Sequence, residues 1–349
     1  MASPTEGASP RQSQVLVRRT VTSVAVIVIG SVPFAVFAVV SGQVAASSLA
    51  VLGSVAVVSN LLIGGQAIAY LTVGLLTALT PIAIVSGTVP VAGAALMALM
   101  CFGVGLSAAQ GLHRGMLLIP MYLAFLIIAP PPWSGLTAVD RTDTSYLLWN
   151  MLFLGGGALW AALVFPPLLR RAKVSPHRRQ PGTRMDTLVY TITITVLCTA
   201  STLGVLIWRP GSNGAWLVVT VLAVTDLGSH ATMKRTWARI AGTVVGVAIA
   251  VIVASIIGSE AVLIGVGLVL SVILVVIALS PHSYFLWTVV VTPQIVLFAS
   301  TSIADANSTA AQRLGLTVIG LALILLASGI TLGWTYHQQA HPSSAAVEP

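Results

Sequence analysis

One stretch of the chain decides its fold: residues 216–246, which read WLVVTVLAVTDLGSHATMKRTWARIAGTVVG. An apolar run ends at Asp226, a short polar turn follows, and a basic segment leads into a second apolar run. Apolar runs joined by short basic segments are typical of a protein that crosses a membrane several times. We therefore interpret this stretch as two transmembrane helices joined on the cytoplasmic side.

The composition of the whole chain supports the same interpretation. Of its 349 residues, 57% are hydrophobic and only 7% are charged, whereas soluble domains carry about 25% charged residues. Because so few charged side chains cannot cover the surface of a soluble globule, we expect this chain to be surrounded by a lipid bilayer. The net charge is +8, and the basic residues stand beside apolar runs. This charge indicates membrane topology and not a nucleic-acid partner.

We interpret twelve apolar runs as helices across a bilayer of about 30 Å, of which Gly115–Ala129 and Ala215–Thr225 are short for a span. They are Thr20–Val40, Ser47–Gly64, Ala67–Gly87, Val89–Ala109, Gly115–Ala129, Tyr146–Leu169, Met185–Trp208, Ala215–Thr225, Ala238–Gly258, Ala261–Ser280, Tyr284–Ser300 and Gln312–Trp334. We predict an all-α polytopic membrane protein with about twelve transmembrane helices in two six-helix halves.

The basic residues test the orientation of these helices. With the N-terminus inside, the cytoplasmic segments hold Arg11, Arg18, Arg19, Arg114, Arg170, Arg171, Lys173, Arg178, Arg179, Arg184, Lys234, Arg235 and Arg239. Only Arg141, Arg209 and Arg313 fall outside. Cytoplasmic loops of membrane proteins carry the excess of Lys and Arg, so we predict that both termini are cytoplasmic.

These assignments divide the chain into segments. They are a cytoplasmic N-terminal tail (1–19), a first six-helix half (20–169), a basic cytoplasmic linker (170–184), a second six-helix half (185–334) and a cytoplasmic tail (335–349).

The two halves also resemble each other in sequence. Ala50–Asn60 aligns with Trp216–Asp226 without a gap, which sets Asn60 on Asp226, and a second offset sets Pro120 on Pro293. Six helices per half predict a parallel repeat about an axis along the membrane normal.

Candidate site residues lie mainly in the polar stretch. Arg235 and Arg239 are four residues apart, so they share one helical face and could hold a carboxylate together. Asp226 could pair with either arginine, and His230 could titrate near neutral pH. The alternative is an ordinary basic loop in which Asp226 only joins helices.

Further polar candidates stand inside the apolar runs. Pro293 removes a backbone hydrogen bond and, next to Gln294, could help line a polar pathway, with Asn60 as another candidate. The alternative is simple hydrogen bonding between helices. Gly242 and Gly246 are spaced for close helix packing, which we favour over a phosphate loop.

A family resemblance rests on the order of these residues. Trp216, the Lys234–Arg235 pair and the motif Arg239-Ile-Ala-Gly242-Thr243-Val-Val-Gly246 resemble the fusaric acid resistance and aromatic acid exporter family. The resemblance covers about residues 185–334. Many relatives carry Gln-Pro where this chain has Asp226-Leu227. They also have large cytoplasmic domains after each helical half, of which we expect almost none in this chain. The resemblance implies an integral membrane fold, a role in transport, and Thr243 among the site residues.

We therefore expect a plasma-membrane transporter for the efflux of small organic or aromatic acids, driven by an ion gradient. A membrane scaffold that moves nothing and an anion channel are the alternatives, and assembly into a homo-oligomer stays open. The sequence shows no paired-carboxylate motif, no His/Cys ligand spacing and no Gly-x-Ser-x-Gly, so we expect no enzyme activity, cofactor or metal.

Overall fold

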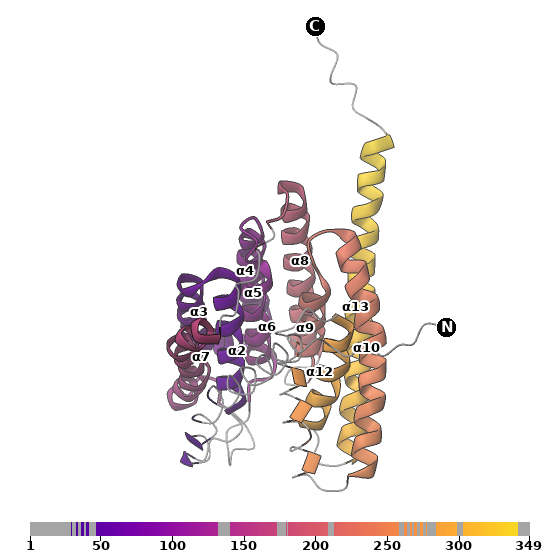
Figure 1. Ribbon diagram of the computed structural model, residues 1–349. Coiled ribbons are helices and arrows are strands. Elements are labelled where there is room, and N and C mark those ends of the chain that lie inside the picture. Colours follow the sequence, from indigo (N-terminus) through magenta and orange to yellow (C-terminus); the bar gives the residue numbers. More distant parts are fainter. Residues whose placement is uncertain are drawn as a thin grey trace, which may run out of the picture.

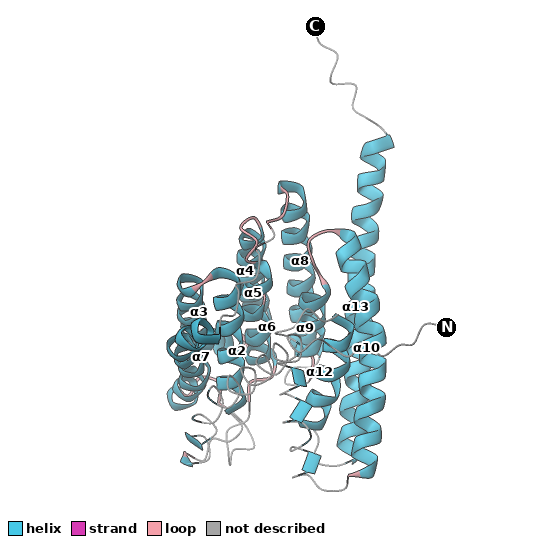
Figure 2. Cartoon of the chain, in the orientation of Figure 1, coloured by secondary structure: helices cyan, strands magenta, loops and turns pink. Residues whose placement is uncertain are grey.

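The computed structural model describes residues 47–131, 140–172, 181–208, 213–257, 284–298 and 303–340, together with Arg179 and single residues between 29 and 41 and between 262 and 277. Within these residues the regular structure is helical, and no strand occurs (Figure 2).

The helices follow one another in the order of the predicted runs. They are α2 (Ser47–Gly64), α3 (Gln66–Ser86), α4 (Pro90–Ala108), α5 (His113–Met116), α6 (Leu118–Ile128), α7 (Thr144–Ala172), α8 (Arg184–Trp208), α9 (Ala215–Val224), α10 (Ser229–Ile256), α12 (Tyr284–Phe298) and α13 (Ile303–Ala340). Ten of the predicted runs coincide with these helices. The runs at 20–40 and 261–280 lie largely outside the described residues.

Six of the described helices are long and apolar enough to cross a membrane. The spans are Gln66–Ser86, Pro90–Ala108, Thr144–Arg170, Arg184–Trp208, Ala231–Ile256 and Asn307–Gly329. The apolar segments in α2, α5–α6 and α9 are shorter. The chain is therefore an all-helical multi-pass membrane protein, while twelve crossings and cytoplasmic termini stay predictions.

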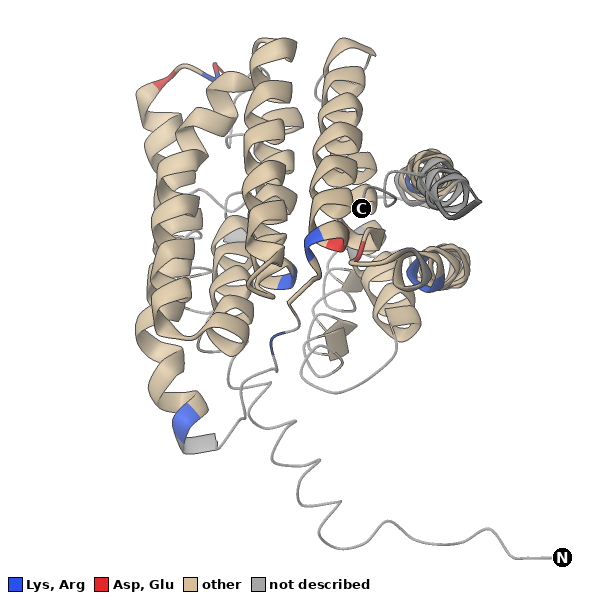
Figure 3. Cartoon of the chain, turned by 90° about the horizontal axis from the view of Figure 1, so that it is seen from above, with Lys and Arg blue, Asp and Glu red and all other residues tan. Residues whose placement is uncertain are grey.

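The outer surface of the bundle is apolar, as a lipid-facing surface must be. Leu99 on α4, Leu163 on α7 and Val196 on α8 each expose more than half of their area. In water such a surface would aggregate, whereas acyl chains solvate it. Most of the described ribbon carries no charge (Figure 3).

The helices form two neighbouring groups (Figure 1). In the first, α2 and α3 pack against α7; in the second, α9 and α10 pack against α13. In the predicted repeat, α9, α10 and α13 correspond to α2, α3 and α7, so these contacts are the ones that such a repeat would produce. Between the groups, α4 packs along α8 and α6 contacts α9.

Two helices, α10 and α13, extend well beyond their apolar runs. The helix predicted at Ala238–Gly258 begins at Ser229, and the one predicted at Gln312–Trp334 begins at Ile303 and reaches Ala340, well beyond its neighbours in Figure 1. Hydrophobicity marks only the part of a helix in lipid, whereas backbone hydrogen bonding continues past it. The predicted run placed Arg313 at the outer end of its helix, whereas Arg313 lies in the third turn of α13 and is 2% exposed. The side of the membrane on which it lies stays a prediction.

Candidate functional site

The site begins at a break in the helical backbone. α9 ends at Val224 and α10 starts at Ser229, with Gly228 between them at a φ of 87°. A side chain would strain that conformation, so glycine belongs here. The Thr232 hydroxyl accepts a hydrogen bond from the Asp226 amide at 3.1 Å and lies 3.0 Å from the Asp226 carbonyl oxygen. This threonine therefore supports the backbone on both sides of Asp226.

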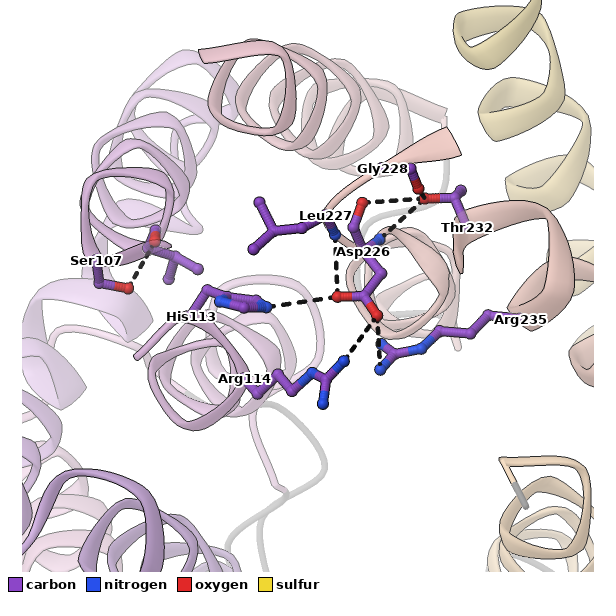
Figure 4. A network of polar contacts seen from close by, with 9 residues as sticks. Ser107, His113, Arg114, Asp226, Leu227, Gly228, Thr232 and Arg235 are labelled. Carbon is purple, nitrogen blue, oxygen red and sulfur yellow. Dashed lines mark hydrogen bonds and ion pairs between the residues drawn. The ribbon is translucent and has the colours of Figure 1, made fainter. Parts of the chain in front are cut away.

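The Asp226 carboxylate joins residues from two parts of the chain (Figure 4). Its Oδ2 lies 2.9 Å from Nη2 of Arg235 on α10 and 3.2 Å from Nη2 of Arg114 on α5. Its Oδ1 lies 3.4 Å from Nε2 of His113, also on α5, and accepts a hydrogen bond from the Leu227 amide at 3.0 Å. We call Asp226, His113, Arg114 and Arg235 the junction cluster, because it links the first half of the chain to the second.

Burial and charge act on Asp226 in opposite directions. Its side chain is only 4% exposed, and this burial by itself would raise the pKa of the carboxyl. The contact with His113 and the charges of Arg235 and Arg114 outweigh burial and lower the pKa of Asp226 from 3.8 to about 2. Asp226 is therefore a carboxylate throughout the physiological pH range.

This shift predicts how the stability of the protein depends on pH. Because the pKa of Asp226 is lower in the folded state, the cluster stabilises the fold fully above about pH 4 and loses this contribution as the pH falls towards 2. The difference in melting temperature between the wild type and Asp226→Asn should be constant from about pH 4 to pH 6 and shrink below that range. Thermal unfolding in detergent measures it. A difference that already vanishes near pH 6 would contradict the lowered pKa.

Arg235 and Arg239 lie on one face of α10, as predicted, but in different surroundings. Arg235 pairs with Asp226 and lies over the Tyr284 ring, with 5.6 Å from the guanidinium carbon to the ring centroid. Arg239 is 2% exposed and lies 6.0 Å from the centroid of the Trp287 ring. The predicted pairing of Asp226 with an arginine is therefore realised by Arg235.

Comparisons with known proteins place this site in a family region. The model of the fusaric acid resistance protein-like family matches residues 189–327. Residues 189–327 are thus similar to fusaric acid resistance proteins. No curated protein and no solved structure matches the chain. The family region contains Asp226, Arg235 and Arg239, whereas His113 and Arg114 come from the preceding half.

The fusaric acid resistance protein-like region also contains the predicted close packing. A Cβ on Gly242 would lie 2.7 Å from the Thr288 Cβ, and one on Gly246 would lie 2.7 Å from the Thr292 Cβ and 3.0 Å from Pro293 Cδ. The packing role of these two glycines against α12 is confirmed. Pro293 is buried at this contact, inside α12.

The other predicted site residues are distributed around these contacts. Thr243 is buried on α10, and Gln294 is half-buried on α12. Asn60, at the end of α2, donates hydrogen bonds of 3.1 Å to the carbonyls of Ala56 and Gly115, so it fastens α2 to α5. His230 stands in the first turn of α10, but its side chain lies outside the described residues. That these residues take part in a transport pathway stays a prediction.

Sequence reasoning missed His113 and Arg114. They precede the fusaric acid resistance protein-like region by more than seventy residues, and only the fold brings them to Asp226. One signal was present: the repeat sets Asn60 on Asp226, and both of these residues contact α5. Arg313 was also missed as a site residue, because the predicted run began at Gln312 and so placed Arg313 at the end of its helix and not within it.

Proposed function

We propose that this protein is a plasma-membrane transporter that exports small organic or aromatic acids in exchange for protons. The multi-pass fold and the fusaric acid resistance protein-like region support a transporter-type protein. The single observation that carries the proposal is the junction cluster, in which Asp226 binds groups from both halves. Ionisable groups buried between membrane helices are costly and commonly mark ion or substrate pathways.

The cluster suggests how proton movement is coupled to a change of shape. Imidazole is the side chain that most often carries protons at neutral pH in proteins, and His113 supplies the imidazole of this cluster. Protonation of His113 places a positive charge 3.4 Å from the Asp226 carboxylate. This strengthens the contact between α5 and the α9–α10 break, whereas loss of the proton weakens it. The protonation state of His113 thereby shifts the equilibrium between two arrangements of the first and second halves of the chain.

Flux across a membrane tests the proposal. The full chain is reconstituted into proteoliposomes loaded with a mixture of small aromatic and aliphatic carboxylates, and their exit is followed by mass spectrometry. We expect at least one carboxylate to leave faster than from protein-free liposomes, and a pH gradient to change its rate several-fold. Anion conductance that does not depend on the pH gradient would indicate an anion channel instead. If the protein causes no exit of any carboxylate, the result would favour a scaffold.

The coupling role of His113 has its own expected result. The His113→Gln variant should still let the carboxylate run down its own gradient, but a pH gradient should no longer drive its export. His177, in the predicted basic linker, provides the matched control as His177→Gln, which should behave as the wild type does. Proton-driven export that survives in His113→Gln would remove His113 from the mechanism.

A further inference from the structure

Two arginines inside the membrane-spanning helices lie apart from the junction cluster. Arg239 on α10 and Arg313 on α13 are each 2% exposed and are among the largest fully buried side chains. The two helices pack along each other, so two buried positive charges lie on neighbouring helices. In a medium of low polarity, two like charges without a counter-charge are strongly unfavourable.

The guanidinium groups have unused hydrogen-bond donors. Nε, Nη1 and Nη2 of Arg313, and Nε and Nη1 of Arg239, have no partner among the described residues. Among the described residues, the ion pairs are those of Asp226, and neither arginine takes part in them. Buried polar groups are normally hydrogen-bonded, so such a concentration of free donors indicates a site for a ligand that supplies the acceptors.

Both arginines stand at depth in the bilayer. Arg239 comes eight residues after Ala231, where its span begins, and Arg313 comes six residues after Asn307. At about 1.5 Å per residue, these positions are roughly 12 Å and 9 Å inside the ends of their spans. Transporter substrates commonly bind near the middle of the membrane, between helices of this kind.

The surroundings of the arginines indicate the chemistry of the ligand. Arg313 lies 4.1 Å from the centroid of the Trp216 ring, and Arg239 lies 6.0 Å from that of Trp287. Each cation is thus combined with a flat apolar surface. A planar carboxylate matches the fork of a guanidinium, and the organic body of the same molecule can use the aromatic surface. A halide would use the charge alone.

We propose that Arg239 and Arg313 form the binding site for the carboxylate group of the transported anion, between α10 and α13. This inference deepens the proposed function, on which its physiological role rests. Because both side chains are buried, the described conformation is closed around the site. An anion enters only when α13 separates from α10, which is the movement that transport requires.

Binding by the purified full chain in detergent tests the site directly. Benzoate is the probe, and benzamide is its neutral counterpart with the same ring. We expect benzoate to raise the melting temperature and benzamide to leave it unchanged. Arg239→Gln and Arg313→Gln should each weaken benzoate binding about tenfold or more, and the lysine variants should fall in between. The control is Arg170→Gln, which removes an exposed arginine at the end of α7. Equal shifts with benzoate, benzamide and chloride would overturn the proposal.

Stability without a ligand separates this role from a structural one. Because Arg313→Gln removes a buried charge whose donors have no described partner, the ligand-free melting temperature should stay unchanged or rise. The side chains of Glu260 and Asp305 lie outside the described residues, so Glu260→Gln and Asp305→Asn are included. Suppose that Arg313→Gln lowers the melting temperature and that Glu260→Gln or Asp305→Asn lowers it by the same amount. Arg313 is then paired with that acid within the chain, and the proposed site is disproved. If Arg313→Gln fails to fold, the proposal is still tested by benzoate binding to Arg313→Lys and by the comparison of benzoate with benzamide on the wild type.

The two proposals fail in different ways. Carboxylate flux that is undiminished in both glutamine variants would leave the transporter in place and remove this site. Benzoate binding that depends on both arginines, without any flux, would keep the site and remove transport.

Discussion

The Asp226→Asn variant is expected to lose nearly all proton-driven transport and much of its stability. Asparagine keeps the size of the side chain but leaves His113, Arg114 and Arg235 without the carboxylate that they share. Removing one partner of a buried ion pair costs about 3–5 kcal/mol. The cost here should be lower, at about 2–3 kcal/mol, because the Arg114 side chain is 48% exposed and water screens its charge. Thermal unfolding in detergent and flux in proteoliposomes measure the two losses.

A double variant separates the two consequences. Asp226→Asn combined with Arg235→Gln removes both members of the closest pair, so part of the stability should return while transport stays absent. Asp186→Asn is the matched control, because Asp186 is an exposed acid whose hydrogen bonds stay at the start of α8. Export at the wild-type rate in Asp226→Asn would mean that the junction cluster has no part in transport.

A leucine in place of Gly157 is expected to prevent α2 and α7 from packing together. A Cβ at Gly157 would overlap the backbone of Ala50, and one at Gly53 would overlap the carbonyl oxygen of Leu154. These neighbours are backbone atoms, so they cannot move aside as a flexible side chain can. Overpacking in a core typically costs about 1–3 kcal/mol of stability and sometimes more. We expect a cost at the upper end of this range, because the inserted side chain meets backbone atoms.

The measurement is the yield of monodisperse protein after mild detergent extraction, followed by its melting temperature. Gly53→Leu should behave as Gly157→Leu does. Gly103→Ala is the control, because a Cβ there meets no atom within 4 Å and alanine favours a helix more than glycine does. A Gly157→Leu protein that folds and melts like the wild type would show that α2 and α7 do not approach as closely as described.

Hydrophobic run length was a dependable guide to the helices and a poor guide to where they end. The run at Ser47–Gly64 matches α2 at both ends, whereas α10 begins nine residues before its predicted start. A run of apolar residues records contact with lipid. A helix, however, can continue past the lipid with polar residues, since its hydrogen bonds are internal. This difference concealed Arg313, which is the third-turn residue of α13 and not a surface charge.

The candidate site was half visible in the sequence. Asp226, Arg235 and Arg239 stood out because they are charges in a chain with very few, and their spacing predicted a shared face of α10. Nothing along the chain connected Asp226 with His113, because that contact joins segments more than one hundred residues apart. Spacing also could not show that Arg235 has a carboxylate beside it while the donors of Arg239 lack described partners.

The sequence by itself determined that this chain is a helical membrane protein in which residues 189–327 resemble fusaric acid resistance proteins. Scarcity of charge leaves lipid as the only suitable solvent, and a short motif is a local property of the chain. The tertiary structure alone decided which charges meet. Pairing depends on distances of a few ångströms between helices that are remote in sequence, and these distances follow from how the helices pack.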